Sequence, residues 1–337
     1  MTEKNTLLSL KVIEDLTFKA LTYAGVTEAN AGYLAKATAI TEAQGVSSHG
    51  LAYIPIYIAH VKCGKVDPEA VPTISHPFES AIKVDARNGF AHPAIELGFK
   101  ELIPTVKGQG IGILNITRSY NCGVLGVHTR ALAEENLIGI GFTNAPASIA
   151  PSGGSRPVVG TNPFSLAVPD REGEFGFLID QSASVVSKSE ILKYLREEKS
   201  IPVGWGLDSE GRSTTDPSEA ITGSMAPAGA YKGVNIAIMV ELFAAVLSGA
   251  NLGKESSPFS GAKGGPPGTG QCFIAINPEI SGKNVFQNRI ETLLQYLSAE
   301  ENSRVPGHNR MKNASIASSK GVLVDNLVLS KVRELLP

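Results

Sequence analysis

The sequence predicts a mixed α/β protein with helical N- and C-terminal parts. Two segments near the N-terminus, Val12–Ala24 and Glu28–Gln44, repeat apolar residues at helical spacing, and Gly25 and Gly45 follow them as stop signals. From about residue 80, short β-rich runs alternate with Gly, Pro, Asn and Asp. At 337 residues the chain is long for one domain, so we expect two or three modules that share a core.

Six short segments are predicted to be strands, because each is apolar, rich in β-branched or aromatic residues and bounded by turn formers. They are Ala81–Asp85, Ile111–Ile116, Leu137–Thr143, Phe164–Val168, Phe177–Asp180 and Cys272–Asn277. A predicted helix, Val124–Glu135, lies between the second and third of them and completes a strand–loop–helix–strand unit. Loops at the carboxyl ends of strands are favoured ligand sites, so the loop Arg118–Gly123 is of interest.

The other predicted elements are mostly helical. They are the start of a helix at Leu51–Tyr57, a polar helix at Glu190–Lys199, a long buried helix at Val234–Leu247, a helix at Phe286–Leu297 and a C-terminal helix after the turn Pro306-Gly307. Residues 205–227 carry turn signals throughout, and residues 257–270 form a Gly/Pro-rich loop. Glu241 interrupts the apolar stretch of the buried helix, which is also short for a membrane span.

The composition excludes several classes of protein. A net charge of −2, with only 18% charged residues and no Lys/Arg runs, argues against nucleic acid or an anionic membrane as the main partner. The 35 Gly and 20 Pro residues are spread without a period, which is typical of a loop-rich globular enzyme. Cys63, Cys122 and Cys272 are too few and too far apart for a disulfide framework or a Cys-rich zinc site. The N-terminus has no signal-peptide pattern, and we expect a soluble cytoplasmic protein.

Two common nucleotide-binding fingerprints fail when they are checked. Residues Gly108–Gly112 resemble G-x-G-x-x-G, but the third Gly comes one residue early and the segment leads into a strand, whereas the fingerprint opens a helix. Residues Gly249–Lys254 are one residue short of a P-loop and lack the Ser or Thr after Lys. The residues therefore support neither a Rossmann dehydrogenase nor a P-loop kinase.

His49 is the histidine most suited to catalysis. It lies in a Gly-bracketed loop beside Ser48, and a side chain that exchanges a proton at neutral pH is most often His. Ser48 is not expected to pair with it, because consecutive side chains usually point apart. Asp180 ends an apolar run, and its carboxylate could either cap the next turn or orient a histidine.

Seven motifs, in order along the chain, resemble the malate/L-lactate dehydrogenase-like family of NAD(P)-dependent oxidoreductases, which includes sulfolactate and ureidoglycolate dehydrogenases and cyclic-imine reductases. They are Ser48-His49-Gly50, Gly139–Asn144, Gly160–Pro163, Asp180, Thr214–Pro217, Tyr231–Gly233 and Pro306-Gly307. The resemblance implies a non-Rossmann nicotinamide-binding fold, with a mixed sheet flanked by helices, and a homodimer. This fold accounts for the missing fingerprint.

The resemblance also implies roles for individual residues. Ser48, His49 and Asp180 match a catalytic group in which the His passes a proton to the substrate. The positions similar to the family's contacts to NADP or NAD are Arg118, Ser119, Tyr120, Asn121, Cys122, Thr161, Asp180, Gln181, Ser182, Lys232, Gly233, Pro306, Gly307 and His308. Tyr53, Asn121, Arg156 and Thr161 are expected at the substrate, and no metal is expected.

Three positions depart from the family pattern. Tyr53 stands where many members carry an Arg for the substrate carboxylate, so either Arg118 or Arg156 replaces that clamp or the substrate carries a different anionic group. Asn121 stands where many members have a His, and Asn cannot exchange a proton at neutral pH, so His49 would carry that role. His308 stands where the family usually has an acidic residue, so the preference between NADH and NADPH stays open.

The resulting hypothesis is an oxidoreductase that moves a hydride between a nicotinamide and C2 of a small 2-oxo or 2-hydroxy acid. Two alternatives remain: a reductase of Δ1-piperideine-2-carboxylate or Δ1-pyrroline-2-carboxylate, and a non-catalytic nucleotide-binding relative. In the expected organisation, residues 1–75 pack with 285–337. Residues 76–187 and 221–284 form the cofactor-binding and catalytic domain, and 188–220 are a small inserted helical segment.

Overall fold

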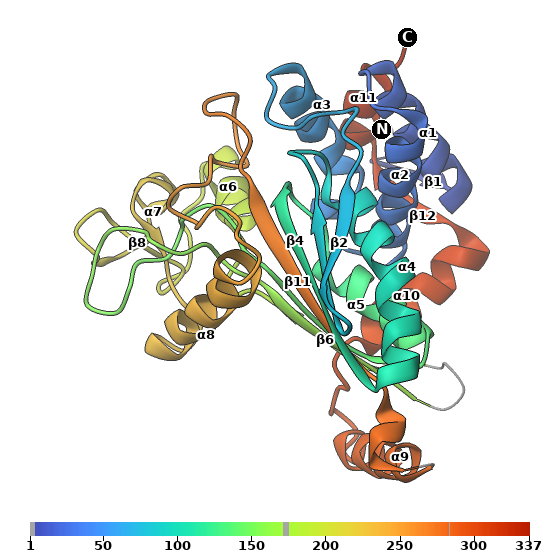
Figure 1. The fold of residues 1–337 in the computed structure, drawn as a ribbon. Helices are drawn as coiled ribbons and strands as arrows, with labels where there is room; N and C mark the ends of the chain where they lie inside the picture. Colours follow the sequence, from blue (N-terminus) through green and yellow to red (C-terminus); the bar gives the residue numbers. More distant parts are fainter. Residues whose placement is uncertain (1–3, 171–174, 283) are drawn as a thin grey trace.

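A seven-stranded mixed sheet lies at the centre of the computed structural model, which describes residues 4–170, 175–282 and 284–337 (Figure 1). Its strands are β2 (Thr73–Phe78), β3 (Ala81–Asp85), β4 (Ile111–Ser119), β5 (Ile138–Thr143), β6 (Phe164–Pro169), β7 (Phe175–Gln181) and β11 (Thr269–Ile276). The order is β2-β3-β4-β11-β5-β6-β7; β3 and β4 are parallel, and the other neighbours are antiparallel. The predicted fold class is confirmed, and all six predicted strands are present.

Helices cover both faces of this sheet. Helices α4 (Ala91–Gln109) and α5 (Leu125–Glu134) pack on one face, and α8 (Tyr231–Glu241) lies on the other. The strands alternate between the two cores as a pleated backbone requires: Phe273 belongs to the cluster under α4, and its neighbour Cys272 to the cluster under α8. The central strand β11 is therefore buried on both sides.

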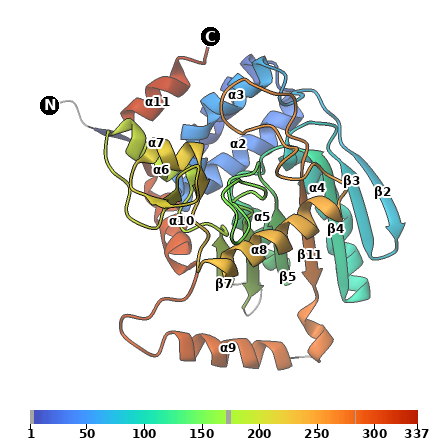
Figure 2. The same cartoon turned by 90° about the vertical axis from the view of Figure 1, so that its left-hand side faces the viewer.

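The N-terminal helices pack with the last part of the chain. Helices α1 (Leu10–Tyr23), α2 (Glu28–Ala43) and α3 (Ile54–Lys62) share a core with α11 (Asn326–Arg333). Strand β1 (Asn5–Leu8) pairs antiparallel with β12 (Val322–Asp325), and α10 (His308–Lys320) contacts α2. Helix α9 (Val285–Leu297) instead projects from the opposite end of the molecule (Figures 1 and 2).

A small subdomain precedes α8. It contains α6 (Lys188–Arg196), α7 (Pro217–Thr222) and a three-stranded sheet of β8 (Gly206–Leu207), β9 (Ser213–Thr214) and β10 (Ser224–Met225). Its core includes Ile191, Ala220 and Met225 and continues onto α8 through Ala237. The turn-rich sequence around residues 205–227 thus forms short strands as well as turns.

Helix α4 and the C-terminal region differ from the sequence expectation. No helix was expected over α4, because Pro93, Gly98, Pro104 and Gly108 all disfavour a helix interior. Packing against the sheet outweighs these preferences, since Leu102 and Val106 on its inner face are fully buried. The single helix expected after Pro306-Gly307 is two helices, α10 and α11, with β12 between them.

The prediction of a buried helix over Val234–Leu247 is wrong in two respects. Regular α8 ends at Glu241 and continues as a π-helical turn, Leu242–Val246. One side of it is also open: Leu242, Val246 and Leu247 are 51%, 57% and 52% exposed. Apolar periodicity indicates that a helix forms, but it does not determine which of its apolar faces another element covers.

Candidate active site

Ser48 and His49 form a hydrogen-bonded pair at the end of α2. They lie in a 3₁₀ turn, Ser47–His49, and Ser48 Oγ is 3.0 Å from His49 Nδ1. The expectation that the two side chains point apart is therefore wrong, because the tight turn lets the imidazole fold back over the preceding hydroxyl. Ser48 is exposed and His49 is half-buried, so the pair is open to a ligand.

A buried carboxylate holds this turn against α2. Glu42 Oε1 accepts a hydrogen bond of 2.7 Å from the backbone N–H of Leu51. A Cβ at Gly50 would overlap the same carboxylate, so the position has room for Gly alone. Burial raises the pKa of Glu42, and the hydrogen bond from Leu51 opposes that rise. The Gly in Ser48-His49-Gly50 is thus explained by space, because a Cβ there would overlap the Glu42 carboxylate.

Asp180 lies in the electrostatic surroundings of His49, together with an arginine that the sequence reading missed. Arg310 Nη1 is 2.5 Å from Asp180 Oδ2, although the two residues are 130 positions apart. Asp180 also packs against the first turn of α5, where a Cβ at Gly126 would lie 2.7 Å from Oδ2. Burial lowers the pKa of His49, Asp180 opposes this shift, and Arg310 adds to it.

Tyr53 and Asn121 complete the polar surroundings of His49. The Tyr53 ring lies parallel to the imidazole at 5.9 Å between centroids, and Asn121 Nδ2 donates a hydrogen bond of 3.4 Å to Tyr53 Oη. Asn121 Oδ1 also accepts from the backbone N–H of Gly123 at 2.7 Å, which fixes the amide orientation. Burial raises the pKa of Tyr53, so its hydroxyl stays protonated.

A cavity of about 10 Å³ lies behind His49, comparable to the space that one water requires. Its walls include His49, Tyr57, His92, Cys122 and His128. Burial and His128 lower the pKa of His92 to about 3, and burial raises the pKa of Cys122 to about 12. Both groups are therefore neutral at physiological pH. His128 Nε2 lies 2.8 Å from the Cys122 carbonyl oxygen.

Four of the segments expected to contact the cofactor lie along β7 and at the residues that follow it. The backbone N–H of Ala183 donates to Thr161 O at 2.8 Å, and that of Leu178 donates to Pro306 O at 3.0 Å. A Cβ at Gly233 would lie 2.7 Å from Ala183 O, so α8 begins directly against this strand end. Thr161, Asp180–Ser182, Lys232-Gly233 and Pro306–His308 thus form one neighbourhood.

A buried hydrogen-bond network supports Thr161 from below. The side chain of Asn162 donates to Glu241 Oε2 at 2.6 Å, and Glu241 Oε1 accepts from the backbone N–H of Gly253 at 2.5 Å. Asn162 Oδ1 accepts from Ala145 N. The Glu that interrupts the apolar stretch is therefore a structural anchor for the Gly160–Pro163 segment.

In the loop after β4, fewer side chains are accessible to a cofactor or substrate than the sequence indicated. Ser119, Tyr120 and Cys122 are buried, and Tyr120 hydrogen-bonds His60, so these residues can reach a ligand only through their backbone. Arg118 donates hydrogen bonds from Nε and Nη2 to the carboxylate of Asp85, so its guanidinium is already paired. Arg156 is exposed on a separate loop.

The described residues hold no group of three or more His, Cys, Asp or Glu side chains arranged for a metal ion. Nor does any helix among them have the length and apolar character needed to cross a membrane.

Sequence and structure comparisons identify close relatives. The family model for malate/L-lactate dehydrogenase matches residues 8–333. The chain is 39% identical to a (2R)-3-sulfolactate dehydrogenase (NADP(+)) of Chromohalobacter salexigens, over 90% of each chain. It is 32% identical to a Δ1-pyrroline-2-carboxylate reductase of Ancylobacter novellus, over 98% of this chain and 97% of the relative. The crystal structure of Δ1-piperideine-2-carboxylate reductase from Pseudomonas syringae superposes with a TM-score of 0.92 at 30% identity, covering 98% of this chain and 99% of the other.

Proposed function

This chain belongs to the malate/L-lactate dehydrogenase family, and from that membership we propose that it is an NAD(P)-dependent oxidoreductase acting at C2 of a small 2-oxo or 2-hydroxy acid. The observation that carries the proposal is the hydrogen-bonded pair of Ser48 and His49 within the electrostatic reach of Asp180. These are the groups needed to exchange a proton at the substrate oxygen when C2 is reduced or oxidised.

The residues at the end of β7 fit a nicotinamide dinucleotide, NADP or NAD. Lys232 is exposed in the first turn of α8, where the positive end of the helix dipole favours an anion such as a pyrophosphate. Gly233 permits the close backbone approach that brings this helix end to the strand. When bound, the nicotinamide supplies or accepts the hydride. The protein supplies the proton, the orientation and the electrostatics.

His49 is proposed as the general acid in reduction and the general base in oxidation. Because Nδ1 is engaged by Ser48 Oγ, Nε2 is the nitrogen left to exchange a proton with the substrate oxygen. Ser48 fixes the ring orientation, and Asp180 stabilises the imidazolium. Arg310 holds the Asp180 carboxylate in place and limits how far it raises the His49 pKa.

The substrate is proposed to lie beside Tyr53, Asn121 and Thr161. The Tyr53 hydroxyl and the Asn121 amide give this side of the site neutral hydrogen-bond donors in place of an arginine. Of the two arginines considered for a carboxylate clamp, Arg118 is occupied by Asp85, which favours Arg156 or a clamp built from the neutral donors.

A cyclic 2-imino acid is the second candidate substrate. It is favoured by the likeness to the Pseudomonas syringae piperideine reductase and by the presence of Ser48, His49 and Asp180. The hydride step is the same for both substrates, and the difference is whether oxygen or nitrogen receives the proton. A non-catalytic role is disfavoured, because a relative that had lost its activity would be expected to lose Ser48, His49 or Asp180 as well.

The decisive experiment follows oxidation of NADH and of NADPH by absorbance. The substrate panel is pyruvate, oxaloacetate, sulfopyruvate, Δ1-piperideine-2-carboxylate and Δ1-pyrroline-2-carboxylate. His49→Ala is expected to lower kcat by roughly 10²–10⁴-fold, the usual contribution of a general acid or base, with cofactor affinity near that of the native protein. Turnover of the variant close to the native rate would refute the role of His49. No turnover of any substrate by the native protein, with cofactor bound, would favour the non-catalytic relative.

The protein is further proposed to be a cytoplasmic homodimer. Its three cysteines are free, which suits a reducing compartment. The open face of α8 and of the π-helical turn that follows it supports the dimer, because Tyr231, Ile238, Leu242 and Val246 are each more than half exposed and their spacing places them along one apolar stripe.

A further inference from the structure

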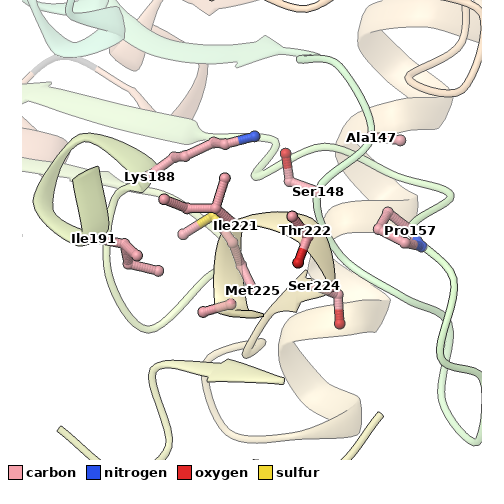
Figure 3. Close-up of a pocket in the computed structure, with 11 residues that line it drawn as sticks. Ala147, Ser148, Pro157, Lys188, Ile191, Ile221, Thr222, Ser224 and Met225 are labelled. Carbon is pink, nitrogen blue, oxygen red and sulfur yellow. The ribbon is translucent and has the colours of Figure 1, made fainter. Parts of the chain in front are cut away.

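Lys65, three residues after α3, is a fully buried lysine outside the candidate active site. Its Nζ donates a hydrogen bond of 2.6 Å to the carbonyl oxygen of Pro258, 193 positions further along the chain. Lys188, the other described lysine whose pKa is lowered by burial, lies instead in the wall of a cavity of about 190 Å³ between α6 and α7 (Figure 3). A buried ammonium is costly without an acceptor, so the burial of Lys65 depends on the loop that carries Pro258.

This loop, residues 257–268, precedes β11 and reaches α3, and we call it the strap (Figure 2). Most of the strap is exposed, and Gly261, Gly264 and Gly268 have positive φ. An exposed, Gly-rich backbone is easily displaced, so the position of the strap is set by the groups on which it docks. Phe259 is its apolar anchor, since this side chain packs against the core that α3 shares with α1, α2 and α11.

His60 is a second polar contact of the strap and joins it to Tyr120. His60 is 1% exposed, and Nε2 lies 3.2 Å from the carbonyl oxygen of Gly261. Because a carbonyl oxygen only accepts, Nε2 carries the proton, and Nδ1 accepts a hydrogen bond from the Tyr120 hydroxyl. Burial and the neighbouring Lys65 lower the pKa of His60, while the Gly261 contact opposes this shift. The ring is therefore neutral at physiological pH, as this arrangement requires.

Tyr120 is held through its side chain and through its backbone by one continuous segment, the strap and the start of β11. Its ring packs edge-on against Phe259, with 5.5 Å between the centroids. Gln271 Nε2 donates to the Tyr120 carbonyl oxygen at 3.2 Å, and Thr269 Oγ1 donates to that of Ser119 at 3.4 Å. The position of the strap therefore affects the loop after β4.

The residues next to Tyr120 belong to the candidate active site. Asn121 follows it in the chain and donates to Tyr53 Oη, beside His49. The ring of Tyr57 contacts those of both Tyr53 and Tyr120, at 4.9 and 5.8 Å between centroids. A shift of Tyr120 is thus passed on along the chain and through a packed ring.

We propose that the strap positions the candidate active site. By docking on Lys65 and His60, it fixes Tyr120, and Tyr120 in turn fixes the orientation of Asn121 and Tyr53. Lys65 and His60 are positioning residues, since their side chains bind the strap and Tyr120 rather than a ligand. Only the effect on catalysis rests on the proposed function.

The docking is tested by trypsin cleavage of the full chain after Lys263, an exposed residue of the strap. Lys65→Met keeps an unbranched buried side chain and removes the donor. Cleavage should become about 10- to 100-fold faster, the range for loss of a hydrogen bond to a charged group, because cleavage follows the population with an open strap. Lys62→Met, an exposed lysine of α3, is the matched control and should be cleaved as the native chain is. Equal rates for Lys65→Met and the native chain would overturn the docking.

A second variant combines His60→Phe with Tyr120→Phe. It removes both partners of one buried hydrogen bond, so neither is left unpaired, and the chain should fold. The bond to Gly261 is also lost, and cleavage after Lys263 should be about 2- to 10-fold faster than in the native chain. An unchanged rate in this variant removes His60 from the proposal.

The link from the strap to the site is tested by amide hydrogen exchange of residues 118–123, followed by mass spectrometry. If one opening frees both segments, exchange in Lys65→Met should rise by the same factor, about 10- to 100-fold, and stay at the native rate in Lys62→Met. Faster cleavage of the strap with unchanged exchange in residues 118–123 overturns the positioning role.

The effect on catalysis is measured by a double-mutant cycle in kcat/KM. Asn121→Ala should cost less in Lys65→Met than in the native chain, because Asn121 has already lost its orientation there. Lys65→Met that only lowers stability gives additive losses, and additive losses overturn the link to catalysis. A native chain that turns over none of the substrates refutes the proposed function, whereas cleavage and exchange still decide what the strap positions.

Discussion

At the scale of single residues, the charge state of His49 is balanced by two opposite neighbours. Asp180 favours the protonated imidazole and Arg310 disfavours it, while burial lowers the pKa of His49 more than either neighbour changes it. Arg310 also forms an ion pair with Asp180, the carboxylate that favours the protonated form of His49. This three-residue arrangement predicts how the pH dependence of catalysis should respond to mutation.

Removing the two charges should move the pH profile in opposite directions. Asp180→Asn withdraws the group that raises the His49 pKa, so the pKa falls further; Arg310→Gln withdraws a lowering group, so the pKa rises. With His49 as the proposed general acid, reduction needs the protonated imidazole, and the alkaline limb of kcat/KM should therefore shift to lower pH in Asp180→Asn and to higher pH in Arg310→Gln. Arg212→Gln removes an exposed, paired arginine and should leave the profile unchanged. Shifts in the same direction would contradict this electrostatic account.

At the scale of elements, the turn that carries Ser48 and His49 is attached to α2 through one carboxylate. Glu42 anchors the Leu51 N–H, and Gly50 leaves the space that this carboxylate occupies. The attachment matters because a displacement of about 1 Å at a reacting group can cost about 10²-fold in rate. The position of His49 therefore depends on a helix whose own sequence carries no catalytic residue.

Gly50→Ala should displace this turn and lower kcat/KM by about 10- to 100-fold. Glu42→Ala makes room for the new methyl group, so in that background Gly50→Ala should cost less, and a double-mutant cycle in kcat/KM measures the coupling. The matched control is Gly32→Ala. Gly32 lies in α2, the helix of Glu42, and a Cβ there meets no described heavy atom within 4 Å. Equal costs of Gly50→Ala in both backgrounds would refute the contact as the cause.

At the scale of the whole molecule, the sheet is covered unequally. On the side of α4 and α5, a second layer formed by α2 and α10 covers the helices, whereas no element lies over the outer side of α8 (Figures 1 and 2). Apolar side chains on that side, such as Ile238 and Leu242, are more than half exposed. An uncovered apolar stripe on a central helix is typical of an interface between subunits. A second copy of the chain would supply the missing layer.

A charge placed on this stripe should therefore break the proposed dimer. If the proposed dimer forms, Leu242→Glu is expected to convert it to a monomer in sedimentation at micromolar concentration, because the interface would bury an unpaired carboxylate. Leu327→Glu on α11, a leucine that is also more than half exposed, should leave the native mass unchanged. A monomeric native protein, or a dimeric Leu242→Glu variant, would contradict an interface at α8.

Local pattern was sufficient for most of the secondary structure. Gly25 and Gly45, both with positive φ, stop α1 and α2 two residues after the last helical residue, and such a left-handed stop can be recognised from a few neighbouring residues. The strand runs were recognisable for the same reason. Helix α4 was missed, since its Pro and Gly residues oppose a helix locally and only burial against the sheet compensates for them.

The sequence by itself determined the mixed fold, the family resemblance and the candidacy of His49, since each depends on residue type and order along the chain. The tertiary structure alone decided which groups surround that histidine. Neither the pairing of Arg310 with Asp180 across 130 positions nor the insertion of β11 between β4 and β5 leaves a local signal. The same holds for the open face of α8. These features are set by which distant surfaces bury one another, and no window of sequence contains both partners.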